Sequence, residues 1–254
     1  MEDPVRWIPY CGEAPAPEAW LSRWNIDPLL GAGLLLAAWV LWRPESSRLR
    51  PRDRLLALRC AWALTVLLYV TPLCALSSAF FTVRVIHHMV LVLVIAPLLA
   101  HGMAPQLRAL PTPLWSCTAV AAVVFWAWHL PVPYAAALSS NAVYALMQFT
   151  LLASATVFWR AVFRAAPPVA IGAILATTVQ MGLLGALITF AGQPLYAPHF
   201  ASTLAWGISP LHDQQFAGLT MWAPGSIAYL AAAIWIGWRW LRTERARGLR
   251  VEPT

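Results

Sequence analysis

Long apolar segments separated by short polar ones dominate the hydropathy pattern of this chain. A helix needs about 20 mostly apolar residues to cross the hydrocarbon core of a bilayer, so each such segment predicts a membrane-spanning helix. The pattern predicts seven of them, over residues 28–42, 54–76, 83–100, 114–130, 141–163, 168–190 and 215–241. The first is short, and its start can be placed as early as Trp20.

The composition agrees with this pattern. Hydrophobic residues make up 60% of the 254 residues, charged ones 11%, and the mean hydropathy is +0.65. Such values are typical of a polytopic membrane protein. We therefore predict an all-α bundle of about seven transmembrane helices over residues 24–241. An extracytoplasmic N-terminal segment (1–23) precedes it, and a basic cytoplasmic tail (242–254) follows it.

The basic residues, all of them arginine, predict the orientation of this bundle. Short loops rich in basic residues stay in the cytoplasm. Arginines follow the first, third, fifth and seventh predicted helices, at Arg43, Arg48, Arg50, Arg52, Arg54, Arg108, Arg160, Arg164, Arg239, Arg242, Arg245, Arg247 and Arg250. With seven spans these arginines share one side, so the N-terminus lies outside and the C-terminus in the cytoplasm. The net charge of +7 then reflects topology and the lipid bilayer, and no binding of nucleic acid is expected.

Five of the six histidines gather at the predicted outer face. They are His87 and His88 near the start of the 83–100 helix, His129 at the end of the 114–130 helix, and His199 and His212 in the loop before the last helix. Ionisable side chains inside a membrane are costly and usually face a partner, a cavity or a ligand. The histidines are therefore the first candidates for a functional site.

Helical spacing selects among these candidates. Arg84 and His88 are four residues apart and share one helix face, which favours His88 over His87 as the inward residue. Asp213 and Met221 lie on one stripe of the last helix, and Met181 can face the same space. Imidazole together with thioether suits a soft metal, Cu(I) above all. The alternative is that these side chains only form hydrogen bonds at the membrane interface.

The four cysteines offer no metal cage. They form no CxxC pair, and the topology puts Cys74 and Cys117 toward opposite faces, so neither a thiolate site nor a disulfide framework is expected. Cys11 could bind a metal or pair with another molecule, or simply belong to a mobile N-terminal tail. The chain has no GxSxG, Walker or HExxH motif, and we expect no enzymatic activity.

Five motifs along the chain together carry a resemblance. They are RVIHHMVL from Arg84, WHLP from Trp128, GLLGALITF from Gly182, PLY from Pro194 and DQQFAGLTMW from Asp213. In this order they resemble the successive signatures of the CtaG family of bacterial polytopic cytochrome c oxidase assembly factors. The matches extend over about residues 24 to 241.

The resemblance implies a seven-helix protein of the bacterial plasma (inner) membrane that acts with a cytochrome c oxidase subunit and handles copper at the outer face. The first of these family signatures often reads His-Met-x-x-His, and here Arg84 replaces its first histidine while His88 matches the second. One potential ligand is thus missing. Either His87 compensates, or Arg84 forms an ion pair with Asp213.

The resulting hypothesis is a transient Cu(I) site. His88 and His129 hold the ion together with Met221, His212 or His87, and Arg84, Asp213 and Gln214 form a supporting network. Two alternatives remain open: a haem-binding protein with His88 and His129 as axial ligands, and a metal-free scaffold for an oxidase subunit. The sequence leaves the oligomeric state undetermined.

Overall fold

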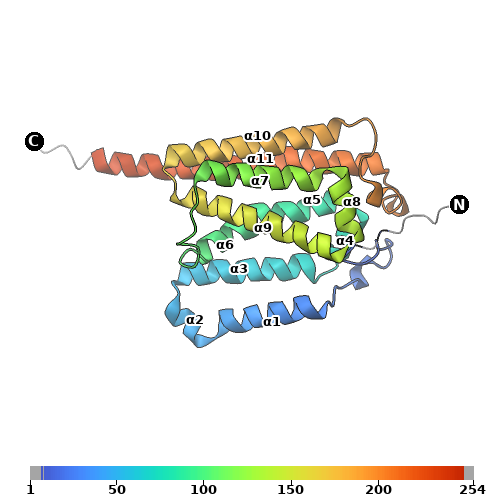
Figure 1. The fold of residues 1–254 in the computed structure, drawn as a ribbon, viewed down its shortest axis with the longest axis horizontal. Coiled ribbons are helices and arrows are strands. Elements are labelled where there is room, and N and C mark those ends of the chain that lie inside the picture. Colours follow the sequence, from blue (N-terminus) through green and yellow to red (C-terminus); the bar gives the residue numbers. More distant parts are fainter. Residues whose placement is uncertain (1–6, 8, 249–254) are drawn as a thin grey trace, which may run out of the picture.

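Helices are the regular elements of the described part of the chain, and most of them lie side by side along one axis (Figure 1). The structure is a computed structural model that describes residue 7 and residues 9–248. Within this part, four helices are long and apolar enough to cross a membrane: Phe81–Gly102, α9 (Asn141–Arg164), α10 (Pro167–Phe190) and α11 (Pro210–Gly248).

Two bent pairs of helices raise this number to six when each pair is taken as one span. The first pair is α3 (Arg52–Tyr69) with α4 (Leu73–Ala79), bent by 50°, and the second is α7 (Leu114–His129) with α8 (Pro131–Ser139), bent by 72°. A shorter apolar helix, α1 (Pro28–Trp42), has the bounds that the hydropathy pattern predicts. The predicted earlier start is wrong, because the chain around Trp20 forms only a short 3-10 turn, η1 (Trp20–Ser22).

The continuous helix predicted over residues 54–76 is interrupted at Val70. Pro72 disfavours a helical conformation of the residue before it, so the chain turns there and starts again as α4. The carbonyl groups left open at the end of α3 are occupied by Asn25. Its backbone N–H donates to the carbonyl oxygen of Val70 at 3.0 Å, and its side chain donates to that of Tyr69 at 3.0 Å. The N-terminal segment thus completes the end of α3.

The helix predicted over residues 83–100 runs from Phe81 to Gly102 in three parts. These are α5 (Phe81–Val90), a π-helical turn η2 (Leu91–Ile95) and α6 (Ala96–Gly102). Pro97 has no N–H to donate to the preceding turn, and a π-helical turn is one way to accommodate this. Since Pro97 cannot donate to the carbonyl oxygen of Val92, this oxygen accepts a hydrogen bond of 2.9 Å from Trp159 Nε1 on α9.

The last helix begins earlier than the apolar pattern predicts. Proline is favoured in the first turn of a helix, and α11 starts at Pro210 instead of residue 215. His212, Asp213 and Gln214 therefore lie on its first turn and not in the preceding loop. Its far end runs through Gly248, into the predicted basic tail, while Arg250 lies outside the described residues.

One edge of the bundle is formed by α1 and the following helix α2 (Pro44–Leu49) (Figure 1). α1 packs on α3 through Trp62, whose Nε1 donates to the carbonyl oxygen of Leu34 at 2.9 Å. Its other face exposes large apolar side chains such as Leu29, Leu35 and Trp39. Such a surface is stable in lipid and costly in water.

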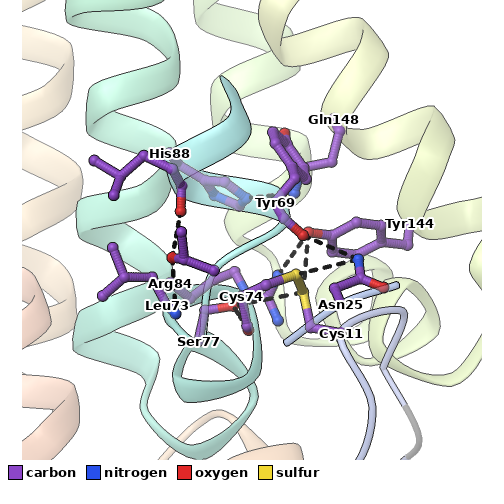
Figure 2. The surroundings of a disulfide bond; sticks show 12 residues. Cys11, Asn25, Tyr69, Leu73, Cys74, Ser77, Arg84, His88, Tyr144 and Gln148 are labelled. Atoms are coloured by element: carbon purple, nitrogen blue, oxygen red, sulfur yellow. Dashed lines mark hydrogen bonds between the residues drawn. A yellow bond between two sulfur atoms is a disulfide. The ribbon is translucent and has the colours of Figure 1, made fainter. Parts of the chain in front are cut away.

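The N-terminal segment lies at the end of the bundle that also holds α4, α8, η3 (Ala197–His199) and η4 (Leu204–Trp206) (Figure 1). A disulfide joins Cys11 to Cys74 on α4 (Figure 2), and Trp206 Nε1 donates to the carbonyl oxygen of Pro15 at 3.1 Å. The expectation that the cysteines form no disulfide framework is therefore wrong, and so is the assignment of Cys11 to a mobile tail. Residues 1–6 and 8 of the predicted N-terminal segment lie outside the described residues.

Candidate metal site

Two of the predicted ligands, His88 on α5 and His129 at the end of α7, lie next to each other. Their ring centroids are 6.4 Å apart and their planes are nearly perpendicular, at 82°. Both side chains are buried. Two imidazoles from different helices thus face a common space in the bundle interior.

That space is a cavity of about 20 Å³, large enough for one water molecule or one ion. Three methionines from three helices line it beside the two histidines: Met89 on α5, Met181 on α10 and Met221 on α11. The complete lining is Val85, His88, Met89, Val92, Phe125, His129, Leu151, Met181 and Met221. Two imidazole and three thioether groups therefore surround one small cavity.

Hydrogen bonds fix the orientation of both imidazoles. His129 Nδ1 donates to the carbonyl oxygen of Phe125 at 2.7 Å, so the lone pair of this ring lies on Nε2. His88 Nε2 accepts from the amide nitrogen of Gln148 at 3.1 Å, and Gln148 Oε1 accepts from the hydroxyl of Tyr69 at 2.8 Å. The bond from His129 to Phe125 is of the kind that selects the tautomer and holds the ring in metal-binding histidines, whereas the bond from Gln148 occupies the Nε2 lone pair of His88.

Gly225 on α11 leaves room for the methionines. A Cβ atom at this position would overlap the methyl group of Met181 and lie 3.1 Å from its sulfur and 3.4 Å from the methyl carbon of Met89. A side chain here would push both methionines out of place. Gly225 directly follows Pro224, the proline inside α11, which has no N–H to donate to the preceding turn.

His87 and His212 do not line the cavity. His87 is buried with its ring edge against Tyr69, at a centroid distance of 4.7 Å, and among the described residues neither of its ring nitrogens has a hydrogen-bond partner. His212 is exposed on the first turn of α11. His87 points away because adjacent helical residues differ in direction by about 100°.

The ion pair between Arg84 and Asp213 is not formed. Asp213 instead accepts hydrogen bonds from the backbone N–H groups of Phe81 and Thr82, at 2.6 and 3.2 Å. Its carboxylate thus sits at the N-terminus of α5, where the helix dipole favours negative charge. Arg84 Nη1 donates to the hydroxyl of Tyr144 at 3.1 Å.

Gln214 has a supporting role between segments. Its Oε1 accepts from the N–H of Leu195 at 2.6 Å, and its Nε2 donates to the carbonyl oxygen of Ile188 at 3.2 Å. It therefore ties the start of α11 to the end of α10 and to the loop that joins them. Arg84, Asp213 and Gln214 therefore do not bond to one another, and each of them bonds to other residues.

His199, which the spacing argument did not select, is also a structural residue. Its Nδ1 donates to the carbonyl oxygen of Ala79 at 3.3 Å, and its Nε2 accepts from the hydroxyl of Tyr134 at 2.7 Å. Burial lowers the pKa of His199 to about 3, so the ring is neutral at physiological pH. With both nitrogens engaged, it has no free lone pair for a metal.

Met89 and Gln148 are the site residues that the sequence argument missed. Met89 directly follows the two histidines, and with Val85, His88 and Val92 it makes the i, i+3, i+4, i+7 pattern of one helix face. This pattern in the sequence could have identified Met89 as a site residue. Within the described part of the chain, no three His, Cys, Asp or Glu side chains come together to hold a metal, so a metal here would depend on thioethers.

The fold and the site together define a class: an all-helical protein with four to six membrane-length helices and a polar site buried among them. The family model described as cytochrome c oxidase caa3 assembly factor (Caa3_CtaG) matches residues 33–243, and the chain belongs to this family. This confirms the resemblance seen in the motifs, and the family indicates a role in cytochrome c oxidase assembly. Comparisons with curated proteins and with solved structures find no match.

Proposed function

We propose that this protein serves oxidase assembly by holding one Cu(I) ion, as cargo, in the cavity between His88 and His129. The observation that carries the proposal is the lining of that cavity by two imidazoles and three thioethers. This donor set matches the preference of Cu(I) for soft and borderline ligands and offers no carboxylate for Mg²⁺ or Ca²⁺. Delivery rather than catalysis is the role that such a site supports.

The ligands differ in how ready they are to bind. His129 has its Nε2 lone pair free, because its Nδ1 is engaged with Phe125. His88 Nε2 is occupied by Gln148, so binding through this atom requires the amide of Gln148 to turn away. The thioethers of Met181 and Met221 carry no proton and need none removed. A site of neutral, exchangeable ligands lets the ion leave for an oxidase subunit.

We also propose that the chain crosses the bacterial plasma membrane seven times, with its N-terminus outside. In this topology α1 and each bent pair count as one span. Two observations support it: α1 exposes a lipid-compatible surface, and the arginine-rich segments lie at the end of the bundle opposite the N-terminal segment (Figure 1). The positive-inside rule then puts the cavity near the outer face.

The cavity does not favour the haem alternative. Axial histidines must leave a full porphyrin between them, whereas the space beside His88 and His129 is about 20 Å³. In the scaffold alternative the protein binds no metal, so a measurement of copper binding distinguishes this alternative from the proposal.

An anaerobic Cu(I) titration of the detergent-solubilised protein against a chromogenic competitor tests the proposal. We expect one equivalent to bind to the wild type, and His129→Ala and Met221→Leu to lose at least tenfold in affinity. His212→Ala is the matched control, because His212 is exposed and lies away from the cavity, and it should bind as the wild type does. Absence of binding, or equal binding by all four proteins, would favour the metal-free scaffold.

A further inference from the structure

The disulfide between Cys11 and Cys74 is surrounded by polar side chains (Figure 2). The hydroxyl of Tyr144 is 3.8 Å from Cys11 Sγ, and the side-chain nitrogen of Asn25 is 3.9 Å from Cys74 Sγ. A sulfur in a disulfide has no proton, so both contacts run from the protein donor to the sulfur. Each sulfur atom therefore faces a hydrogen-bond donor.

Arg84 adds a positive charge to these surroundings. Its Nη1 donates to the hydroxyl oxygen of Tyr144 at 3.1 Å, which leaves the hydroxyl proton of Tyr144 free to point at Cys11. The side chain of Arg84 is completely buried. A guanidinium stays protonated in proteins, so this charge is permanent.

No anion in the described part of the chain pairs with this charge. Arg84 Nε and Nη2 are buried without a hydrogen-bond partner there. The ionisable groups around the guanidinium are phenols and imidazoles, and none is a carboxylate: Tyr69, His87, His88, Tyr134, Tyr144 and His199. A buried charge without a counter-ion is strongly unfavourable. Arg84 reaches Cys11 Sγ through the hydroxyl of Tyr144, and this sulfur can supply a negative charge when the disulfide is reduced.

We propose that Cys11 and Cys74 form a redox-active centre whose reduced state, one thiol and one thiolate, is stabilised by Arg84 through Tyr144. An external dithiol is the reductant. Its thiolate attacks the sulfur of Cys11, the less buried residue of the pair at 8% exposure against 0% for Cys74, and the Cys11–Cys74 bond breaks with Cys74 leaving as a thiolate. The second thiol of the reductant passes its proton to the Cys74 thiolate and then attacks the mixed disulfide, which releases Cys11 as the thiolate that faces Tyr144.

This exchange is balanced. The reductant loses two electrons and becomes a disulfide, and the protein gains both electrons. Of the two protons on the reductant, one stays on the protein pair and one goes to solvent. Stabilising the reduced state makes a disulfide easier to reduce, because the equilibrium shifts toward the thiolate. A disulfide with only a structural role needs no buried cation beside it.

The test is the reduction equilibrium of the full-length, detergent-solubilised protein in buffers of reduced and oxidised dithiothreitol. A maleimide that adds a fixed mass to each thiol counts two labelled cysteines in the oxidised protein, Cys60 and Cys117, and four in the reduced one. We expect Arg84→Gln to lower the equilibrium constant for reduction at least tenfold, which is about 30 mV for this two-electron couple.

Two further variants keep the test decisive. Tyr144→Phe preserves the ring that stacks on Tyr10 and removes only the bridging hydroxyl, so it should also lower the constant, by several-fold, if Arg84→Gln does not fold. Arg59→Gln is the control, because Arg59 bonds to the carbonyl oxygen of Leu41 at the α1 edge and should leave the constant unchanged. The proposal is overturned if the wild type stays oxidised throughout, or if Tyr144→Phe and Arg84→Gln titrate as the wild type does.

Discussion

The carboxylate of Asp213 on α11 accepts a hydrogen bond of 2.6 Å from the backbone N–H of Phe81, the first residue of α5. The N–H groups in the first turn of a helix have no partner within the helix, and this contact supplies one from another helix. The helix that carries His88 and Met89 is thereby anchored to the helix that carries Met221.

Replacing this carboxylate should destabilise the fold. Asp213→Ala leaves the buried N–H group of Phe81 and the half-buried N–H group of Thr82 without an acceptor, at a cost of about 1–3 kcal/mol for the buried one. We expect thermal unfolding in detergent to shift down by several degrees. Asp213→Asn keeps one acceptor oxygen and should shift less. Equal unfolding temperatures for wild type and Asp213→Ala would show that the contact contributes nothing.

A small side chain at Gly225 should impair copper binding without touching a ligand. The added Cβ of Gly225→Ala would collide with Met181 and press on Met89. We expect an affinity for Cu(I) at least tenfold below that of the wild type, measured by competition with a chelator. Gly237→Ala, on the same helix, meets its nearest neighbour at an ordinary 3.6 Å and should bind normally. The methionines are not ligands if both variants bind equally.

His199 should make the protein sensitive to acid. Its pKa is about 3 in the folded state against 6.5 for an ordinary histidine, so between these values the unfolded chain binds one more proton than the folded one. Stability from this residue is therefore lost as the pH falls from about 6.5 toward 3, at about 1.4 kcal/mol per pH unit. His199→Gln removes this contribution. The shift in unfolding temperature between pH 7 and pH 5 should be smaller in this variant, and an identical shift would rule the mechanism out.

The topology can be tested with introduced cysteines at two exposed positions at opposite ends of the bundle. His212 lies at the end with the N-terminal segment, and Arg48 lies on α2 at the other end. In intact cells, a membrane-impermeant maleimide should label His212→Cys but not Arg48→Cys, and should label both after the membrane is opened. The reverse pattern in intact cells would mean that the chain is inserted the other way round.

The sequence predicted helices well where apolar runs meet prolines or arginines, as in α1 and α9. It missed the interruption before Pro72, because the apolar pattern continues across it. The start of α11 at Pro210 was missed as well, because the polar residues that follow it read as a loop. This error is what placed His212 among the ligands.

The site was predicted in part for similar reasons. Spacing within one helix identified His88 and Met221, but the resemblance to the family was needed to favour His129. The pairing of Cys11 with Cys74 joins residues 63 positions apart, and no spacing rule indicates which cysteines meet. Arg84 and Asp213 looked complementary in charge, yet helix α5 uses the carboxylate for its own N-terminus.

The close approach of α10 and α11 implies how a bound Cu(I) ion could be released. A Cβ atom on Gly185 would lie 2.8 Å from the carbonyl oxygen of Gly218 and 3.0 Å from the backbone nitrogen of Trp222, so the two backbones are in near contact. These two tightly packed helices carry Met181 and Met221. A small outward slide of the pair would withdraw two of the five donors in a single step. The ion would then have open coordination positions, which ligands of an acceptor protein could fill.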